Sequence, residues 1–585
     1  MRKLLVYLRD YKKESVLAPL FKLLEASFEL IVPLVMAAII DQGIAQGDKP
    51  YILKMCLALV ALALIGLVCS ITAQFFAAKA AVGFATKLRH ALFEHIEQLS
   101  FSEMDQVGTS TLITRITSDI NQVQSGVNLV LRLFLRSPFI VFGAMIMAFT
   151  IDVKAALIFV VAIPLLSIVV FGIMVVSIPL YRKVQAGLDK VLGITRENLT
   201  GARVIRAFNK QSDEIEKFTE DNEILTRMQM FVGRISALMN PVTYIIINGA
   251  TIVLIWTGAV RVDGGILTQG EVVALVNYMS QILVELIKLA NLIINITKSI
   301  ACGNRIESIM ELESSIVEQT PADFAEKLKA GEEQETIVAF KNVGLAYQGA
   351  EEEALTDIDF EVKRGQTIGI IGGTGSGKSS VVNLIPRFYD VTRGQVLLHG
   401  IDVKEYPVSY LREIVGMVLQ KAVLFKGSIR ENLMWGNEQA TDEEMMEALR
   451  IAQAKEIVEG KEGGLAYEIE QGGKNLSGGQ RQRLTIARAI VKKPEILILD
   501  DSASALDFAT DAKLRAAIRE MKDTTVFIVS QRASSIQYAD QIIVMEDGEM
   551  AGIGTHEELL ANCEIYQEIY YSQFKRDEKA AGEAR

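Results

Sequence analysis

The chain has 585 residues, half of which are hydrophobic, and its mean hydropathy of +0.28 is high for a soluble globular protein. Its net charge of −11 argues against a nucleic-acid-binding protein, which would need a basic face. Four cysteines lie far apart and follow no metal-binding spacing, so we expect reduced thiols of an intracellular chain at Cys56, Cys69, Cys302 and Cys563.

Long apolar segments fill the first half of the chain. Each reaches the roughly 20 residues that a helix needs to cross a bilayer. Together they predict six spans, near 16–40, 55–80, 127–150, 155–181, 237–260 and 272–297. Lys and Arg are frequent before the first span and rare in the short outer loops, so the positive-inside rule places both termini in the cytoplasm. No cleavage site follows the first span, which we therefore expect to be retained in a multi-pass protein of the plasma membrane.

The two inner connections, about 81–126 and 182–236, are long, charged and helically periodic. We expect them to extend the spans as helices into the cytoplasm. The predicted organisation is a transmembrane domain over 1–315, an acidic linker over 316–336, a nucleotide-binding domain over 337–575 and a polar tail over 576–585.

Ionisable residues also occur inside the predicted spans. Such groups are costly in lipid and usually face a bundle interior or a cavity. Two interpretations stay open. The residues contact a transported compound, or they sit near the membrane interface or neutralise one another, as Glu285 and Lys288 could at helical spacing. The residues are Glu25, Glu29, Arg132, Arg136, Glu285 and Lys288.

From about residue 337, short β runs alternate with helical stretches, which is typical of an α/β domain. The strand TIGIIG (367–372) runs into GGTGSGKSS (372–380) and then into an apolar helix, and this is the context of a phosphate loop. Backbone N–H groups of such a loop bind phosphates, Lys378 adds a positive charge, and the Ser379 hydroxyl can bind Mg²⁺. The predicted ATP-binding residues here are Gly372, Gly373, Thr374, Gly375, Ser376, Gly377, Lys378, Ser379 and Ser380.

A second apolar strand, EILILD (495–500), ends in two adjacent aspartates. Asp500 is predicted to hold the Mg²⁺ ion through its water shell. The next residue, Asp501, stands where a catalytic carboxylate would orient or deprotonate the attacking water.

Between the two motifs lies NLSGGQRQRLTIARAI (475–490), and here the chain resembles an ATP-binding cassette (ABC) transporter of the exporter half-transporter type. The resemblance covers essentially the full length and includes LRSPFIVFGAMIMAF (135–149) and ENLTGARVIRAF (197–208) in the membrane half. It implies an all-α six-helix transmembrane domain followed by an α/β nucleotide-binding domain. The implied activity is ATP-driven export of hydrophobic or amphipathic compounds, such as drugs or lipid-like molecules.

The resemblance also assigns further residues. Tyr347 corresponds to the aromatic residue that stacks on adenine, and Gln420 to the Q-loop residue that reaches Mg²⁺. The signature acts on the ATP of a second nucleotide-binding domain, so the chain is expected to dimerise. Its residues are Leu476, Ser477, Gly478, Gly479 and Gln480, and those of the D-loop are Ser504, Ala505, Leu506 and Asp507.

Two positions depart from the family pattern. Asp501 replaces the catalytic Glu, and Gln531 replaces the switch His. Asp is one methylene shorter than Glu, and Gln carries no proton or charge. We therefore expect a degenerate site that binds ATP but hydrolyses it poorly, and a different partner chain that carries Glu and His.

Two other functions compete with ATP-driven export. A nucleotide-gated regulatory or channel-like membrane protein would need ATP binding but not hydrolysis. An importer is disfavoured, because importers of this family usually keep membrane and nucleotide domains on separate chains.

Overall fold

The computed structural model describes residues 1, 3–502 and 505–574, and the chain forms two compact units. The first unit contains Met1–Glu97 and Ser110–Glu311, and the second contains Gln98–Thr109 and the chain from Leu312 onward. The expected boundary between transmembrane domain and linker, at 315, lies four residues beyond Glu311. The predicted tail 576–585 lies outside the described residues.

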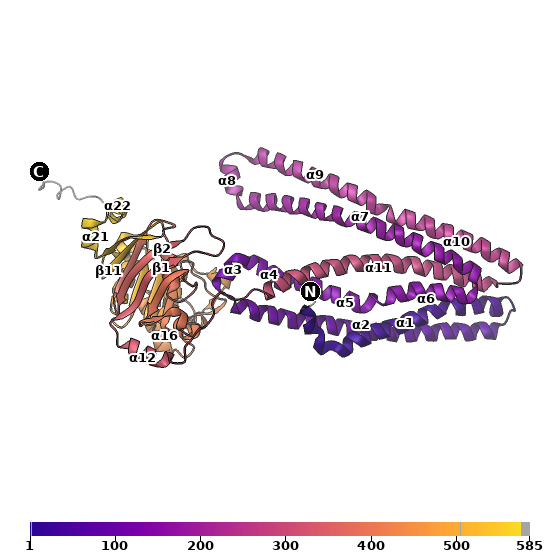
Figure 1. Ribbon diagram of the computed structural model, residues 1–585, viewed down its shortest axis with the longest axis horizontal. Helices are drawn as coiled ribbons and strands as arrows, with labels where there is room; N and C mark the ends of the chain where they lie inside the picture. Colours follow the sequence, from indigo (N-terminus) through magenta and orange to yellow (C-terminus); the bar gives the residue numbers. More distant parts are fainter. Residues whose placement is uncertain (2, 503–504, 575–585) are drawn as a thin grey trace. The chain divides into compact units, whose positions relative to one another are not determined.

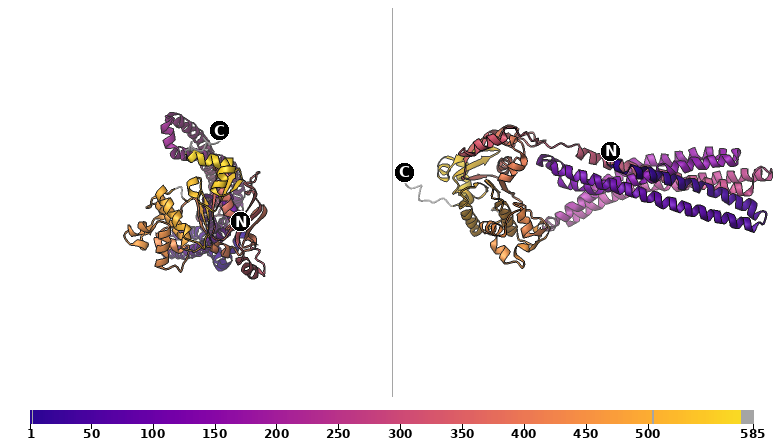
Figure 2. Two further views of the ribbon diagram at one scale, coloured as in Figure 1. Left: turned by 90° about the vertical axis from the view of Figure 1, so that its left-hand side faces the viewer. Right: turned by 90° about the horizontal axis from the view of Figure 1, so that it is seen from below.

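The described part of the first unit is helical, and six of its helical stretches are long and apolar enough to cross a membrane. This confirms the predicted six-span architecture. The views in Figures 1 and 2 agree that the long helices run side by side. The elements are η1 (Lys3–Tyr11), α1 (Lys12–Ala38), η2 (Ile39–Ile44), α2 (Lys49–Gln98), α4 (Thr109–Thr114), η3 (Arg115–Asp119), α5 (Ile120–Leu133), α6 (Arg136–Ile151), α7 (Val153–Thr200), α8 (Ala202–Ala207), α9 (Gln211–Ala237), α10 (Met239–Asp263) and α11 (Gln269–Met310).

The third span differs from the continuous helix expected over 127–150. It is interrupted between Leu133, where α5 ends, and Arg136, where α6 begins. Pro138 lies in the first turn of α6 and has no N–H to donate to the carbonyl of Phe134, four residues earlier. The interruption therefore follows from a proline that the hydropathy pattern does not register.

Small residues let the spans approach closely in the core of this unit. Ala26, Ala144, Ala148 and Ala155 are fully buried there among larger apolar side chains. Gly270 makes a similar close contact, since a Cβ atom at this position would lie 2.4 Å from the carbonyl oxygen of Ala37. The first and sixth spans thus meet where α1 ends and α11 begins.

The second unit contains the predicted α/β fold. Its strands are β1 (Thr336–Leu345), β2 (Leu355–Lys363), β3 (Thr367–Gly372), β4 (Arg393–Leu398), β5 (Ile401–Asp402), β6 (Val415–Val418), β7 (Gly427–Ser428), β8 (Glu468–Ile469), β9 (Ile496–Asp500), β10 (Thr525–Val529), β11 (Gln541–Glu546) and β12 (Glu549–Gly554). Its helices are α3 (Phe101–Val107), α12 (Phe324–Glu332), α13 (Lys378–Leu384), η4 (Val403–Glu405), α14 (Val408–Ile414), α15 (Ile429–Met434), α16 (Asp442–Ile451), α17 (Lys455–Glu459), η5 (Gly464–Ala466), η6 (Gln471–Gly473), α18 (Gly478–Ile490), α19 (Phe508–Arg519), α20 (Ala533–Ile536), α21 (His556–Asn562) and α22 (Glu564–Gln573).

A six-stranded sheet in the order β12-β11-β3-β10-β9-β6 forms the centre of this unit. All of its neighbouring pairs are parallel except β11 with β12. Its central strands are buried apolar runs, as expected for strands covered on both faces. A four-stranded sheet, β2-β1-β4-β5, packs beside it through a second apolar cluster.

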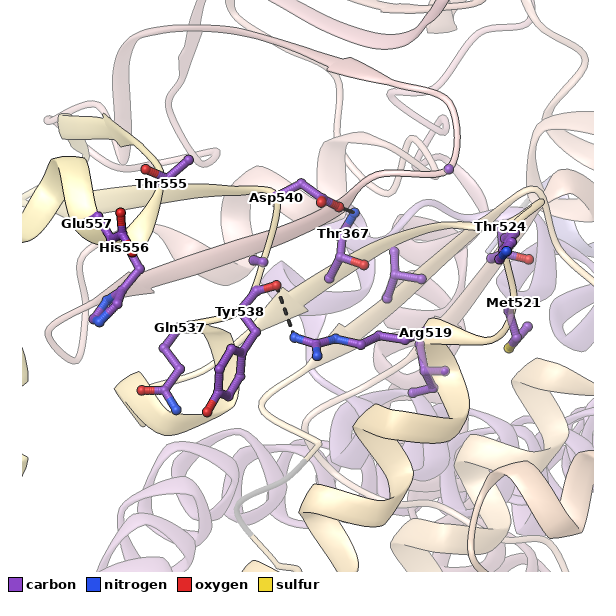
Figure 3. Close-up of a pocket in the computed structure, with 15 residues that line it drawn as sticks. Thr367, Arg519, Met521, Thr524, Gln537, Tyr538, Asp540, Thr555, His556 and Glu557 are labelled. Atoms are coloured by element: carbon purple, nitrogen blue, oxygen red, sulfur yellow. Dashed lines mark hydrogen bonds between the residues drawn. The ribbon is translucent and has the colours of Figure 1, made fainter.

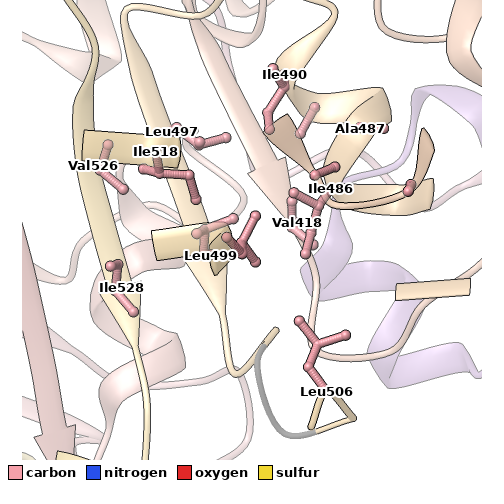
Figure 4. Packing of buried hydrophobic residues seen from close by; sticks show 14 of the residues in the cluster. Val418, Ile486, Ala487, Ile490, Leu497, Leu499, Leu506, Ile518, Val526 and Ile528 are labelled. Carbon is pink, nitrogen blue, oxygen red and sulfur yellow. The ribbon is translucent and has the colours of Figure 1, made fainter. Parts of the chain in front are cut away.

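The helix that begins at the signature packs directly on the central sheet (Figure 4). Ile486, Ala487 and Ile490 of α18 are buried in the same cluster as Leu497 and Leu499 of β9. The start of α18 is therefore fixed by an apolar core and not by a flexible loop.

Helix α3 belongs to the second unit, although the sequence placed it in the transmembrane domain. The Phe101 ring lies 4.5 Å from the Phe388 ring, centroid to centroid. The Tyr389 hydroxyl donates to Asp105 Oδ2 over 2.6 Å. Helix α12 falls inside the segment 316–336 that is predicted to be a linker.

Candidate nucleotide-binding site

The predicted phosphate loop joins the central strand β3 to α13, in the strand–loop–helix order that the motif requires. Gly375 and Gly377 both have a φ of 88°, a conformation that favours glycine. A Cβ atom on Gly377 would also lie 2.7 Å from Leu355 Cδ2. The loop residues Gly372, Gly373, Thr374 and Ser376 complete this turn. The sequence therefore specifies a tight turn at the start of a helix, where N–H groups bind anions.

Lys378 is buried and its ammonium group lies on its own loop. It donates to the carbonyl oxygens of Gly372 and Gly373 and, over 3.2 Å, to Ser376 Oγ. Burial lowers the pKa of Lys378, and the charges of Asp501 and Asp500 oppose this effect. A triphosphate bound in the loop would add negative charge beside this buried cation.

The ends of β3 and β9 meet across β10, and this brings Ser379 to Asp500. The Ser379 hydroxyl donates to Asp500 Oδ1 over 2.9 Å. Burial raises the pKa of Asp500, the hydrogen bond from Ser379 opposes this, and the charge of Asp501 adds to it. Two hard oxygen ligands at one point fit Mg²⁺, which uses few protein ligands and keeps several waters.

Asp501 lies directly beyond the end of β9 with a φ of 44°, in the left-handed region. Its N–H donates to the carbonyl of Val529 over 3.0 Å, and its Oδ2 lies 3.4 Å from the Gln420 side-chain amide. Asp and Asn tolerate this backbone conformation better than longer residues do. The predicted metal ligand Gln420 therefore reaches Asp501 and lies beside the predicted magnesium position.

Gln531 follows β10, and its side chain is exposed. Its carbonyl accepts a hydrogen bond of 2.8 Å from Gln573 of α22, whose Oε1 in turn accepts from the N–H of Ala533. The sequence motifs gave no indication of Gln573. It is separated from the switch position by about forty residues and belongs to no motif of its own.

Tyr347 was assigned to the adenine base by resemblance. Its hydroxyl lies 2.8 Å from Ser380 Oγ, next to the phosphate loop, and its ring meets Tyr389 edge to face at 5.1 Å. No sequence motif indicates Tyr389. Burial, together with the hydrogen bond to Asp105, raises the pKa of its hydroxyl well above the usual range, so the group stays neutral.

The signature residues lie at the start of α18. Ser477 and Gln480 form a reciprocal capping box, and Leu476 is buried behind them. Among the described residues, a Cβ atom on Gly478 would meet no other atom within 4 Å, whereas one on Gly479 would lie 3.1 Å from the carbonyl of Ala505. The surface at Gly478 is thus open as far as the described residues go.

The D-loop follows β9 and leads into α19. Leu506 is buried, and Asp507 caps α19 by accepting from the N–H of Thr510 over 2.9 Å. Ser504 lies outside the described residues. One edge of the sheet brings together residues 378, 379, 420, 500 and 501. The signature instead starts a helix that packs on α15 and α16.

Most of the charged residues within the spans pair with one another. Arg136 donates to Glu285 Oε1 over 2.7 Å and to Glu29 Oε2 over 2.6 Å, and Lys288 also reaches Glu285. Lys22 is paired in the same way with Glu25. Arg132 lies near the end of α5, and its Nε has no hydrogen-bond partner among the described residues. This geometry favours mutual neutralisation over substrate contact.

A separate cavity of about 920 Å³ lies at the opposite edge of the central sheet, where Thr367 begins β3 (Figure 3). Arg519 lies across it, donates to the carbonyl of Tyr538 over 3.0 Å and stacks on the Tyr538 ring. The residues that line it include none from the phosphate loop or the signature. This cavity is therefore not the nucleotide site.

Known proteins match the chain over both units. Residues 15–286 match the ABC transporter transmembrane region family, and residues 355–504 match the ABC transporter family of ATP-binding domains. An uncharacterized ABC transporter ATP-binding protein of Mycobacterium tuberculosis is 36% identical over 97% of each chain. The fold and the site thus define an ABC exporter-type protein, and the chain belongs to the ABC transporter family, with an ATPase coupled to transport.

Other relatives carry more specific names. A Bacillus subtilis ATP-binding/permease protein named for multidrug export is 32% identical over 98% of this chain and 99% of its own. An ATP-dependent lipid A-core flippase of Syntrophus aciditrophicus is 31% identical over 84% of this chain and 80% of its own. A solved bacterial Atm1-family ABC exporter with ATP bound has the same fold, with a TM-score of 0.78 at 22% identity over 96% of this chain and 99% of that one.

Proposed function

We propose that the chain is one half of a dimeric exporter that moves hydrophobic or amphipathic compounds, drug-like or lipid-like, across the plasma membrane. In this proposal both termini and the nucleotide-binding domain are cytoplasmic, because positive residues flank the spans on that side. Relatives named for multidrug export and for lipid A-core flipping support this substrate class.

The open surface at Gly478 supports dimerisation. The N–H groups at the start of α18 form an anion site. Within the described part of the chain, no atom lies within 4 Å of a Cβ built on Gly478, which leaves this site accessible to a second chain. In the proposed dimer the signature contacts the γ-phosphate of ATP bound to the partner's phosphate loop. Closure of the two nucleotide-binding domains would then rearrange the membrane helices.

The site on this chain is proposed to bind ATP and to hydrolyse it slowly. Lys378, Ser379 and Asp500 supply the phosphate and metal contacts, and Mg²⁺ would neutralise phosphate charge there. Asp501 carries its carboxylate about 1 Å short of the position that Glu would reach, and a displacement of this size can cost about 100-fold in rate. Gln531 can hydrogen-bond a phosphate but cannot carry a positive charge.

A degenerate site beside an unaltered signature favours a heterodimer. The signature and D-loop act on the partner's nucleotide, so they are needed even if the site of this chain is slow. We propose that the partner is a different half-transporter that carries Glu and His at the positions that correspond to Asp501 and Gln531.

The test follows the nucleotide that remains on each chain. After several turnovers of the assembled transporter, site-specific photolabelling should recover mainly ATP on this chain and mainly ADP on the partner. Recovery of mainly ADP on this chain would overturn the degenerate-site proposal. Hydrolysis-dependent uptake of a fluorescent amphiphile into inverted vesicles separates an exporter from a nucleotide-gated channel, which would need ATP binding only.

A further inference from the structure

The switch segment, residues 530–533, carries Gln531 away from the central sheet after the end of β10. The helix α22, which is distant in sequence, is hydrogen-bonded to this segment by the side chain of Gln573. We propose that Gln573 is a positioning residue: it holds the backbone of the switch segment so that the Gln531 side chain meets the γ-phosphate of ATP bound on this chain. The inference rests on the proposed ATP site and extends that site to α22.

The backbone at Arg532 is extended, with a φ of −96° and a ψ of 117°. In extended backbone, the carbonyl before a residue and the N–H after it point to the same side. The Gln573 amide occupies that side. Its Nε2 donates to the carbonyl of Gln531 over 2.8 Å, and its Oε1 accepts from the N–H of Ala533 over 2.9 Å. One side chain thus pairs with the segment as a neighbouring strand would, and fixes the backbone before and after Arg532.

The other contacts of the switch segment leave this backbone less constrained. The N–H of Arg532 donates to Ser530 Oγ over 3.0 Å, within the segment itself. The Arg532 guanidinium lies 5.0 Å from the centroid of the Phe508 ring, at the start of α19. Among the described residues, the hydrogen bonds that tie the backbone of 531–533 to a part of the chain outside the segment and α20 both come from Gln573.

Helix α22 is anchored in the core of the second unit. Tyr566 is fully buried in the apolar cluster there, and Phe574 packs against the same cluster. The Tyr566 hydroxyl lies 2.7 Å from Nδ1 of His556 in α21. The Phe574 ring stacks on the Tyr570 ring, with 4.7 Å between centroids. Gln573 therefore extends from a helix whose place is set by packing on both sides of it in sequence.

The contact requires a donor and an acceptor at the end of one side chain, and an amide supplies both. A carboxylate at position 573 could accept from the N–H of Ala533, but it would face the carbonyl oxygen of Gln531 with no proton to donate. Leu has a similar size and offers neither group. Gln573→Glu therefore removes one of the two hydrogen bonds, and Gln573→Leu removes both.

The effect on the reaction should pass through the γ-phosphate. The amide of Gln531 can hydrogen-bond a phosphate oxygen but carries no charge that would attract the phosphate over a distance. Its contribution thus depends on a backbone that presents it at the right place. ADP has no γ-phosphate, so a displaced Gln531 should weaken the binding of ATP and leave the binding of ADP unchanged.

The test measures nucleotide affinity in the purified full-length protein with Mg²⁺. The probes are ADP and AMP-PNP, which keeps a γ-phosphate and resists hydrolysis, and each displaces a fluorescent nucleotide. Gln573→Leu and Gln573→Glu should each weaken AMP-PNP binding about fivefold and change ADP binding by less than about twofold. Gln567→Leu is the matched control, because it removes an amide of the same helix that donates to the carbonyl of Leu560 over 2.8 Å, away from the switch segment. This control should bind both nucleotides as the wild type does.

A double-mutant cycle with Gln531→Ala shows whether Gln573 acts through Gln531. Gln531→Ala should itself weaken AMP-PNP binding, and Gln573→Leu should add nothing to that loss. A merely structural role of Gln573 would instead produce losses that add to each other and that affect both nucleotides.

Three outcomes would overturn the positioning role: unchanged AMP-PNP affinity in Gln573→Leu, an equal loss for ADP, or additive losses in the double variant. If Gln531→Ala binds AMP-PNP as tightly as the wild type, the proposed phosphate contact of Gln531 is wrong, and the positioning role with it. The assay needs no transport, so a failed uptake experiment would refute the exporter and leave the binding result in force.

Discussion

The side-chain amide of Gln420 lies 3.4 Å from the Asp501 carboxylate, so the loop after β6 contacts the residue that follows β9. Asp501 combines this contact with a left-handed backbone and a hydrogen bond from its own N–H to Val529. The short acid is thus held close to its own strand. A Glu at this position would extend farther from the same anchored backbone.

Placing the family residues at positions 501 and 531 should raise the rate of ATP hydrolysis. In the purified, verified homodimer, Asp501→Glu with Gln531→His should increase ATP turnover by up to about 100-fold, because the carboxylate moves about 1 Å toward the attacking water. The left-handed backbone makes Glu cost about 1 kcal/mol of stability. Phosphate release measures the rate. Gln537→His is the control, since it adds a histidine outside the site; an unchanged rate in the double variant would refute the degenerate assignment.

One lysine variant and one glycine variant distinguish the ATP site of this chain from the ATP site of the partner. In a heterodimer with a wild-type partner, Lys378→Ala should weaken ATP binding and reduce turnover. Gly478→Asp should abolish turnover, because it places a carboxylate against the partner's γ-phosphate at a cost of several kcal/mol. Free space around Gly478 predicts an unchanged melting temperature for Gly478→Asp, which serves as the folding control. An active Gly478→Asp beside a dead Lys378→Ala would reverse the assignment.

Asp500→Asn should separate stability from metal binding. Burial raises the folded-state pKa of Asp500, so its contribution to stability is present below about pH 4 and is lost as the pH rises through the raised value. The metal-free variant should therefore be at least as stable as the wild type at neutral pH, with a difference that shrinks in acid. Added Mg-ATP should stabilise the wild type much more. Thermal unfolding over a pH series measures both effects. If the variant is less stable than the metal-free wild type at neutral pH, the ionised Asp500 does not destabilise the fold and the prediction is wrong.

Removing Arg136 should destabilise the membrane unit. Arg136 and Glu285 are nearly buried, with side-chain exposures of 8% and 3%. Arg136→Met leaves Glu285 short of a partner and should cost about 3 kcal/mol, and adding Glu285→Gln should recover much of it. Arg227→Met breaks an exposed pair with Glu223 and should cost less than about 1 kcal/mol. Thermal unfolding in detergent compares them, and equal losses for Arg136→Met and Arg227→Met would show that the buried pair is unimportant.

Short-range sequence patterns predicted the features that depend on residues close together in the chain. The apolar runs predicted six spans, and the strand–loop–helix order around Lys378 predicted the turn with Gly375 and Gly377. The family pattern singled out Asp501, but its left-handed backbone depends on β10, a neighbour far away in sequence. The Gln573 contact with the switch segment and the break near Pro138 likewise depend on packing or single residues that averaged patterns miss.

The placement of α3 bears on how the nucleotide-binding unit can be isolated. A fragment that begins at 312 would lack Phe101 and Asp105, and so would uncover the aromatic pair Phe388 and Tyr389. Exposed aromatic patches of this kind promote self-association. The chain crosses between the two units three times, not once, so the nucleotide-binding unit is not one continuous segment. Soluble fragments should therefore aggregate unless a peptide that covers 98–109 is supplied or fused.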